Sequence, residues 1–183
     1  MQRIVNRSIG LVSGLVLLGA GLGGCSGSRV PDWSYTSASG ANQSLSDYHG
    51  QIVVLGFTNT WCDPCQEAAP HLQELQERFA DRGVKVLAVN AWERGDPESY
   101  MQEHGYTFGL LLNGTELARE YEVTQIPTFY VIGANGRAVY HHEGFEEDTP
   151  KQMARVIEKQ LRKMEREALR HQKVAQHDDA EMH

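Results

Sequence analysis

The sequence predicts an α/β fold in which helices cover a mixed β-sheet. Two short apolar runs rich in β-branched residues, 52–58 and 84–90, have the length and composition of buried strands. The segment between them, residues 64–80, repeats apolar residues at helical spacing. Strands that alternate with helices in this way are typical of a sheet sandwiched between helical layers.

Turn and capping residues define the later elements. Asp96 followed by Pro97 predicts the start of a helix, because aspartate caps a helix and proline fits its first turn. A short helix follows at about residues 115–121. Strands at 128–132 and 137–141 flank an Asn-Gly pair, which tolerates the positive φ of a hairpin turn.

A last helix opens at Pro150 and keeps apolar spacing as far as Leu161. Beyond this point charged residues dominate and the apolar pattern thins. We therefore expect a folded domain over residues 32–163 and a charged, disordered C-terminal tail over 164–183.

The N-terminus has the pattern of an export signal. Two arginines precede an uncharged apolar run, residues 9–24, which is short for a bilayer span of ~20 residues. Small residues then precede Cys25. This resembles a bacterial lipoprotein signal, with cleavage of residues 1–24, lipid on the Cys25 sulfur and a short linker over residues 25–31. The alternative is an uncleaved anchor helix; both place the domain in the cell envelope, facing the periplasm or the cell exterior.

Composition excludes two broad classes. The chain of 183 residues is 40% hydrophobic, which supports a packed core rather than a wholly disordered chain. It has 17 basic and 24 acidic residues, for a net charge of −7. With no basic patch evident in this balance, we expect no nucleic-acid partner.

Two cysteines at the start of the first long helix carry the predicted chemistry. Free N–H groups and the positive end of the helix dipole stabilise a thiolate at Cys62. Cys65 follows one turn later, close enough to attack a mixed disulfide. Pro64 suits the first helical turn, whereas the negative charge of Asp63 opposes thiolate formation. We expect Cys62 to be the nucleophile, Cys65 the resolving thiol, and their disulfide the only redox group, with no separate cofactor.

The alternative for a Cys-x-x-Cys pair is half of a zinc site. Zinc requires about four ligands, usually a second Cys or His pair at short spacing. Cys25 is the only other cysteine, and the adjacent His141 and His142 suit tetrahedral ligation poorly. Redox chemistry is favoured, and no metal site is expected.

Four segments carry a resemblance to the TlpA/ResA group of membrane-tethered thiol–disulfide oxidoreductases, which are thioredoxin-like. They are Leu-Ser-Asp-Tyr-His-Gly-Gln at 45–51, Trp-Cys-Asp-Pro-Cys at 61–65 with Pro70, Tyr-Glu-Val-Thr-Gln-Ile-Pro-Thr at 121–128, and Asn-Gly-Arg at 135–137. The resemblance spans about residues 32–161. It implies a three-layer sandwich around a central mixed sheet.

The resemblance also implies a substrate site. Pro127 is then expected to be cis and to face the cysteines, with Ile126 offering backbone groups to an extended substrate segment. Trp61 is expected to contact substrate, although a packing role is equally open.

The chain departs from its relatives at the proton-transfer positions. Gly56 stands where thioredoxins place a buried aspartate, and Ala68 stands where ResA-type proteins carry a glutamate. Glu67 is adjacent, but one helical step rotates it about 100° away. The proton-transfer group is left unassigned.

The function expected from these patterns is reduction of disulfides in exported proteins, including paired cysteines in cytochrome c maturation. A membrane electron donor then re-reduces the pair. Two alternatives are less favoured. A Sco-type copper module spaces its cysteines by three residues and adds a downstream histidine. A peroxide-reducing relative requires threonine and proline where this chain has Asn59 and Gly56.

Overall fold

A five-stranded mixed sheet forms the centre of the molecule in the computed structural model, which describes residues 27–181. Its strand order is β5-β4-β3-β6-β7. The strands are β3 (Ile52–Thr58), β4 (Val84–Asn90), β5 (Gly109–Leu111), β6 (Thr128–Ile132) and β7 (Ala138–Glu143). The helices are α1 (Asp63–Phe79), α2 (Pro97–Glu103), α3 (Thr115–Glu120) and α4 (Thr149–Glu181). The thioredoxin-like α/β prediction is confirmed.

Strand β3 lies at the middle of the sheet and explains its mixed character. It pairs in parallel with β4, to which α1 connects it, and antiparallel with β6. Strand β7 then returns antiparallel to β6 through the turn at Gly136, where φ is 71°. The predicted strands at 52–58, 84–90 and 128–132 have these bounds in the structure.

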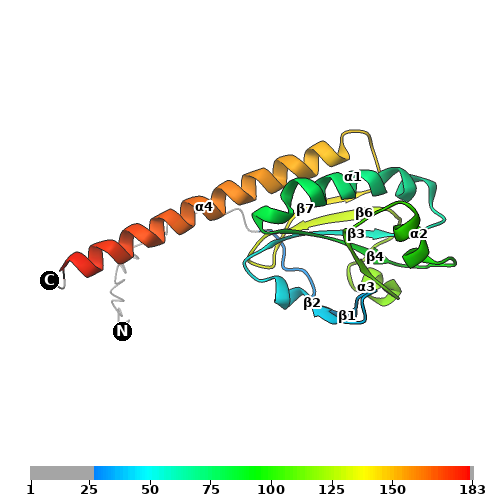
Figure 1. Cartoon of the computed structure of the whole chain (residues 1–183), viewed down its shortest axis with the longest axis horizontal. Coiled ribbons are helices and arrows are strands. Elements are labelled where there is room, and N and C mark those ends of the chain that lie inside the picture. Colours follow the sequence, from blue (N-terminus) through cyan, green and yellow to red (C-terminus); the bar gives the residue numbers. More distant parts are fainter. Residues whose placement is uncertain (1–26, 182–183) are drawn as a thin grey trace, which may run out of the picture.

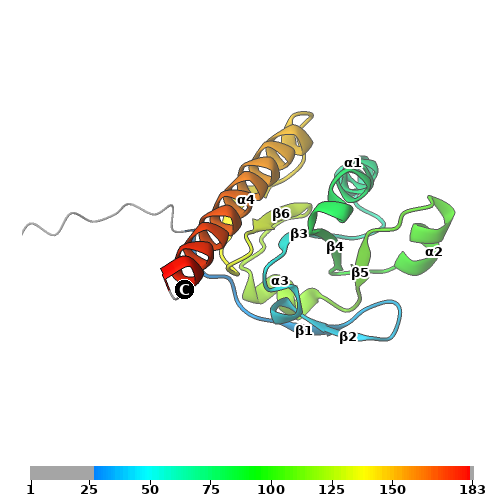
Figure 2. The same cartoon turned by 60° about the vertical axis from the view of Figure 1, so that its left-hand side comes forward.

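The two faces of the sheet carry different layers. Helices α1 and α4 cover one face, and α3 covers the other with a two-stranded sheet of β1 (Ser34–Thr36) and β2 (Asn42–Ser44) (Figures 1 and 2). Alternate residues of β3 separate the two cores, with Ile52 packing toward the α1 side and Val53 toward the α3 side. The sandwich is therefore closed by apolar contacts on both faces.

The folded domain begins before residue 32. Val30 is buried, and the Ser28 carbonyl accepts a hydrogen bond of 2.9 Å from the Ala138 amide. Gly27 lies so close to the Ala138 carbonyl that a Cβ there has no room. The expected linker over residues 25–31 is thus too long, because from Gly27 onward the chain already packs along β7.

The expected disordered tail is also wrong over most of its length, because α4 continues as far as Glu181. The apolar pattern does stop where it was expected to: between residues 149 and 177, Leu161 is the last buried residue of the helix, and Leu169 is 57% exposed. Beyond Leu161 the sequence is rich in Glu, Lys, Arg, Ala and Gln, which favour helix without burial. A Lys163–Glu167 pair at 3.8 Å adds i,i+4 support.

The export signal and Cys25 lie outside the described residues. Within residues 27–181, none of the helices combines the length and the apolar character that a membrane span requires.

Candidate active site

The two cysteines lie where β3 gives way to α1. Cys62 is the N-cap of the helix, and its sulfur accepts a hydrogen bond of 3.3 Å from the Cys65 amide. Pro64 occupies the first turn, as predicted, and Asp63 is an exposed acidic residue of the same turn. The sequence folds this way because residue 62 is extended while proline preorganises the helix that follows.

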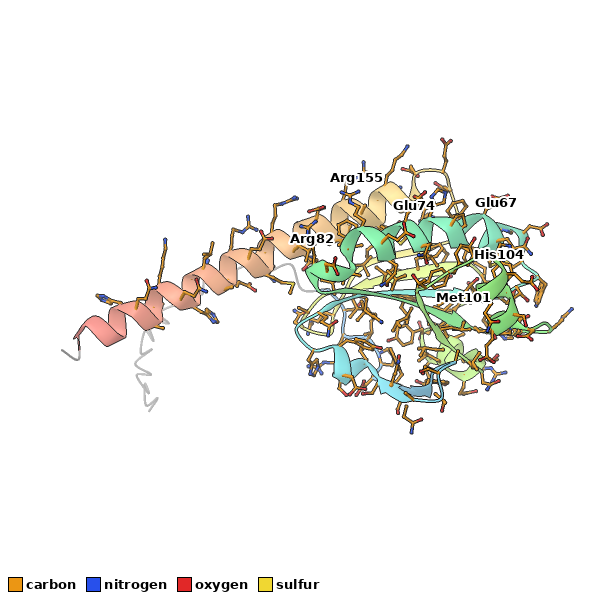
Figure 3. The ribbon with its side chains drawn as sticks, viewed as in Figure 1. Glu67, Glu74, Arg82, Met101, His104 and Arg155 are labelled. Carbon is orange, nitrogen blue, oxygen red and sulfur yellow. A yellow bond between two sulfur atoms is a disulfide. The ribbon has the colours of Figure 1, made fainter. Side chains whose placement is uncertain are left out.

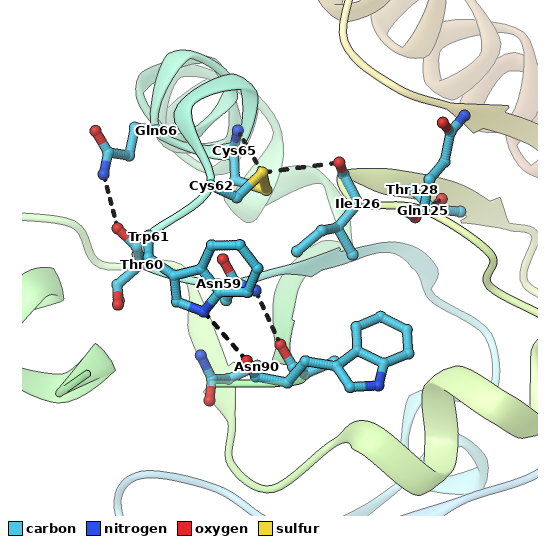
Figure 4. The surroundings of a disulfide bond; sticks show 12 residues. Asn59, Thr60, Trp61, Cys62, Cys65, Gln66, Asn90, Gln125, Ile126 and Thr128 are labelled. Atoms are coloured by element: carbon cyan, nitrogen blue, oxygen red, sulfur yellow. Dashed lines mark hydrogen bonds between the residues drawn. A yellow bond between two sulfur atoms is a disulfide. The ribbon is translucent and has the colours of Figure 1, made fainter. Parts of the chain in front are cut away.

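Cys62 and Cys65 form a disulfide, with their Cα atoms 5.2 Å apart (Figure 4). Cys62 is 8% exposed and Cys65 is 3% exposed. The more accessible sulfur is therefore that of Cys62, as expected for the nucleophile, but both cysteines are buried. An attacking substrate thiol reaches Cys62 more readily than Cys65.

The Ile126–Pro127 peptide bond is cis, as expected from the resemblance. Antiparallel pairing of Phe57 with Thr128 brings this turn beside the loop that ends at Cys62. The Ile126 carbonyl oxygen lies 3.7 Å from the Cys62 sulfur (Figure 4). In the reduced protein a Cys62 thiol has a hydrogen-bond acceptor in this position, whereas a thiolate is opposed by the carbonyl dipole.

Trp61 forms the exposed rim of the site. It is 48% exposed, and its indole N–H donates a hydrogen bond of 3.1 Å to the Trp92 carbonyl. The Arg94 guanidinium lies 4.9 Å from the centre of the Trp61 ring. The indole N–H and one face of the ring are thereby held, and about half of this residue next to Cys62 in the chain stays exposed.

Glu93 organises the loop behind this rim, and the sequence analysis did not identify it. Its carboxylate accepts hydrogen bonds from the Thr60 amide (2.9 Å) and hydroxyl (2.8 Å), and from the Asn90 side chain (2.6 Å). The Arg94 and Gly95 amides each donate a further bond of 2.7 Å. Burial on its own raises the pKa of Glu93, but the Asn90, Thr60, Arg94 and Gly95 hydrogen bonds outweigh it and lower the pKa to about 2.

A signal for Glu93 does exist in the sequence. It follows the buried run at 84–90, and the carboxyl ends of neighbouring parallel strands meet at the same edge of a sheet. Because β3 and β4 are parallel, the residues just after Asn90 lie beside those just after Thr58.

The structure explains why Gly56, rather than the aspartate of thioredoxins, stands in β3. A Cβ at Gly56 would lie 3.3 Å from the Phe129 ring and 3.5 Å from Leu72, so apolar side chains fill the space next to this position. Ala68 is buried at 3% exposure, whereas Glu67 is exposed. The expectation that Glu67 lies away from the Cys65 side of the helix agrees with this placement.

A small cavity of about 30 Å³ lies behind the disulfide, lined by Cys65, Ala68 and Asn59 among others. Asn59 is 4% exposed; its amide N–H donates to the Ala91 carbonyl at 3.2 Å. Its side-chain oxygen is buried and, within the described residues, has no hydrogen-bond partner. The cavity has room for one or two water molecules. The lining is mostly apolar, and Asn59 supplies a buried polar group beside Cys65.

No cluster of three or more His, Cys, Asp or Glu residues suited to a metal ion occurs between Gly27 and Glu181. His141 instead stacks on Tyr130 with ring centres 4.5 Å apart, and lies 3.8 Å from Glu143. The side chains around the cysteine pair in this part of the chain thus do not complete a metal site.

Comparisons with known proteins agree with this geometry. The chain is 36% identical over 112 residues to the thiol-disulfide oxidoreductase ResA of Geobacillus kaustophilus, covering 60% of this chain and 64% of that protein. It is 34% identical over 113 residues to ResA of Geobacillus thermodenitrificans, covering 61% and 65%. The chain thus spans just under two thirds of the length of these relatives.

Among solved structures, a putative thiol:disulfide interchange protein DsbE from Chlorobium tepidum superposes with a TM-score of 0.65. The two are 26% identical, and the match covers 74% of this chain and 97% of that one. The sequence model of the AhpC/TSA family matches residues 26–141, which is more than half of the chain. The chain therefore belongs to the AhpC/TSA family.

Proposed function

We propose that the protein is a thiol–disulfide oxidoreductase that uses Cys62 and Cys65 as its redox pair. The observation that carries this proposal is the disulfide at the N-terminus of α1, with Cys62 at the surface opening and the Ile126 carbonyl 3.7 Å from its sulfur. The resemblance to two ResA proteins and to a DsbE structure supports the same activity.

In the first step, the reduced Cys62 thiolate attacks one sulfur of a substrate disulfide. A Cys62–substrate disulfide forms, the substrate S–S bond breaks, and the departing substrate sulfur takes up a proton as a thiol. The α1 N-terminus and the Cys65 amide stabilise the attacking thiolate.

In the second step, Cys65 loses its proton and attacks the Cys62 sulfur. The mixed disulfide breaks, the second substrate sulfur leaves as a thiol, and the Cys62–Cys65 disulfide forms. Two electrons and two protons have then passed to the substrate. We assign the uptake of the Cys65 proton to solvent water that enters the cavity beside Cys65 and Asn59, because this cavity is large enough for water and Asn59 has an unpartnered oxygen.

Substrate recognition is proposed to use the backbone at Ile126 and the ring of Trp61. An extended segment that pairs with Ile126 as an added strand brings its own sulfur next to Cys62. Trp61, about half exposed and held by Trp92 and Arg94, provides apolar contact on the other side of the opening. Such recognition selects an exposed, extended cysteine segment rather than one amino-acid sequence.

The physiological setting is proposed from the N-terminal segment, which resembles a lipoprotein signal. Lipid on Cys25 holds the domain at the membrane in the cell envelope, where exported proteins with disulfides or paired cysteines are the substrates. Cytochrome c maturation is one such task. Because that compartment is oxidising, a membrane-embedded dithiol carrier has to reduce the pair again after each turnover.

Trapping of the mixed disulfide tests this assignment. Cys65→Ser removes the resolving thiol, so it should accumulate a covalent complex with a disulfide-containing peptide and show no turnover. Cys62→Ser should form no such complex, because the buried Cys65 lacks the surface opening. Non-reducing electrophoresis and mass spectrometry identify the linked cysteine.

Cys25→Ser is the matched control, since it removes the third cysteine and leaves the pair intact. Trapping and turnover should both survive in this variant. A complex formed at Cys65 in Cys62→Ser, or full turnover by Cys65→Ser, would contradict the proposed roles.

A further inference from the structure

The basic residues of α4 lie along one side of the helix. They are Lys151, Arg155, Lys159, Arg162, Lys163, Arg166, Arg170 and Lys173. At about 100° per residue, all of them fall within an arc of roughly 120°. We call this set the α4 basic stripe; from Lys151 to Lys173 it runs for about 33 Å.

The stripe faces away from the sheet. Met153, Ile157 and Leu161, which pack on the core, lie on the opposite side of the helix by the same spacing. The basic side chains are exposed, and Arg155 lies on the outer side of α4 in Figure 3. The stripe is therefore open to solvent along α4.

Glu158, at the edge of the stripe, is neutralised from another element. Arg82 binds its carboxylate through two nitrogens, at 2.9 and 3.1 Å, and Arg78 through one, at 3.2 Å. These contacts lower the pKa of Glu158, with the Arg82 hydrogen bond as the main cause. The closest partners of Glu158 thus come from α1 and the turn after it, and on α4 Arg162 lies 3.9 Å from the same carboxylate. Lys163 pairs with Glu167 at 3.8 Å, and the other cations of the stripe exceed the acidic residues beside them in number.

The charge of the molecule is thus divided between two regions. Residues 27–148 carry 7 Lys and Arg against 18 Asp and Glu, whereas residues 149–177 carry 8 against 3. Three acidic residues, Asp178, Asp179 and Glu181, follow at the C-terminal end of α4, beyond the stripe. The net charge of −7, from which no basic patch was expected, therefore conceals a basic segment on an otherwise acidic chain. An anionic surface attracts the helix and repels the body, which fixes the orientation of the molecule.

The part of α4 that follows Leu161, which we call its free half, also exposes apolar side chains. Leu169 and Val174 are 57% and 56% exposed, and Leu169 lies within the arc of the stripe. Cations combined with exposed large apolar residues along one helix are typical of segments that lie on a bilayer surface. A nucleic acid is the alternative partner. Its phosphates would bind the cations of the stripe, but they offer no apolar surface to Leu169 and Val174.

The chain reaches the domain beside this stripe. Gly27 lines the same surface hollow as Lys159, Lys163 and Arg166, and the Arg137 guanidinium donates a hydrogen bond of 2.7 Å to its carbonyl. Cys25 is only two residues before Gly27, so lipid on its sulfur brings the membrane to the stripe. Only this step, the approach of the membrane through lipid on Cys25, rests on the proposed anchoring.

We propose that the α4 basic stripe docks on a bilayer surface with anionic headgroups and holds the acidic body away from it. Each cation near such a surface contributes about fivefold in affinity. The docking is therefore sensitive to salt and to the loss of a few stripe residues.

The test uses the full chain and two kinds of vesicle, phosphatidylcholine alone and phosphatidylcholine mixed with phosphatidylglycerol. The readout is the ratio of the two partition coefficients, because the apolar leader and any lipid on Cys25 contribute to both. We expect the wild type to prefer the anionic vesicles and to lose the preference at high salt. Arg166→Gln combined with Arg170→Gln should reduce the ratio by at least about tenfold.

Lys85→Gln combined with Arg119→Gln is the matched control, since it removes the same charge from outside the stripe. It should leave the ratio unchanged, and circular dichroism should show the same helix content in both variants. Equal wild-type binding to both vesicles, or an equal loss in both variants, would overturn the proposal. Binding to duplex DNA that depends on Arg166 and Arg170, without preference for anionic vesicles, would also overturn it. Failure of lipid anchoring lowers binding to both vesicle types alike and is thus distinguishable.

Discussion

The Cys62 sulfur is placed between groups that act in opposite directions on a thiolate. The N-terminus of α1 and the Cys65 amide, 3.3 Å away, stabilise negative charge there. The Ile126 carbonyl oxygen at 3.7 Å and the neighbouring Asp63 oppose it. A thiolate that is only moderately stabilised makes the dithiol a better reductant, because reduction potential rises as the reduced form becomes more stable.

Glu93 is the residue outside the cysteine pair whose substitution should have the clearest effect on stability. Glu93→Gln keeps the size of the side chain but removes the charge that accepts hydrogen bonds from Thr60 and Asn90. We expect the free energy of unfolding at pH 7 to fall by about 1–3 kcal/mol. Urea unfolding of both proteins measures the difference, and Glu103→Gln, an exposed glutamate of α2, is the control.

The pH dependence of this difference follows from the lowered pKa of Glu93. The pKa is about 2 in the folded protein against an ordinary value of 4.5, so the ionised carboxylate stabilises the fold fully above pH 4.5. That contribution is lost as the pH falls from 4.5 toward 2. The difference between wild type and Glu93→Gln should shrink over this window; a difference that is unchanged at pH 3 would contradict the assignment.

At the scale of elements, α4 has a packed half and a free half. Leu161 is 5% exposed and belongs to the core, whereas Leu169, two turns later, is 57% exposed. Leu161→Ala should lower the free energy of unfolding by about 2–4 kcal/mol. Leu169→Ala should change it by less than about 0.5 kcal/mol. Comparable losses in the two variants, measured by urea unfolding, would mean that the free half packs on something in solution.

The bounds of buried strands could be predicted from the sequence, whereas those of exposed elements could not. The strands at 52–58, 84–90 and 128–132 are nearly continuous apolar runs, and their bounds were predicted from sequence. Strands β1 and β2 are polar three-residue segments whose pairing with each other is set by tertiary structure. The free half of α4 was missed for the opposite reason: local helix propensity, rather than an apolar face, maintains it.

The residues of the site that belong to sequence motifs could be predicted, whereas those brought in by tertiary structure could not. The sequence pattern identified Cys62 and Cys65, because they form a compact motif at the start of a helix. The cis state of Pro127 was expected only from the family resemblance. Glu93 and Asn59 belong to no motif. Their roles arise from the parallel alignment of β3 and β4, which brings two loops together, and from an unpaired oxygen that is visible only in three dimensions.

At the scale of the whole molecule, the redox site and the basic helix are separate features of one acidic protein. The site lies where β3 meets α1, whereas the free half of α4 extends beyond the sheet (Figure 1). Under the two proposals, lipid on Cys25 and the α4 basic stripe hold the protein at a bilayer, and the exposed Trp61 contacts substrate proteins there. In the proposed function, the cysteine pair delivers electrons to such proteins.

The reduction potential of the Cys62–Cys65 pair tests that claim most directly. It is measured on the chain from residue 26 onward, equilibrated against thiol buffers of defined potential. We expect a value of about −230 mV or below, in the range of thioredoxin and glutaredoxins, as required of a reductase that needs an electron donor. A value near about −120 mV would mean that the pair inserts disulfides instead, and the proposed direction of electron flow would be wrong.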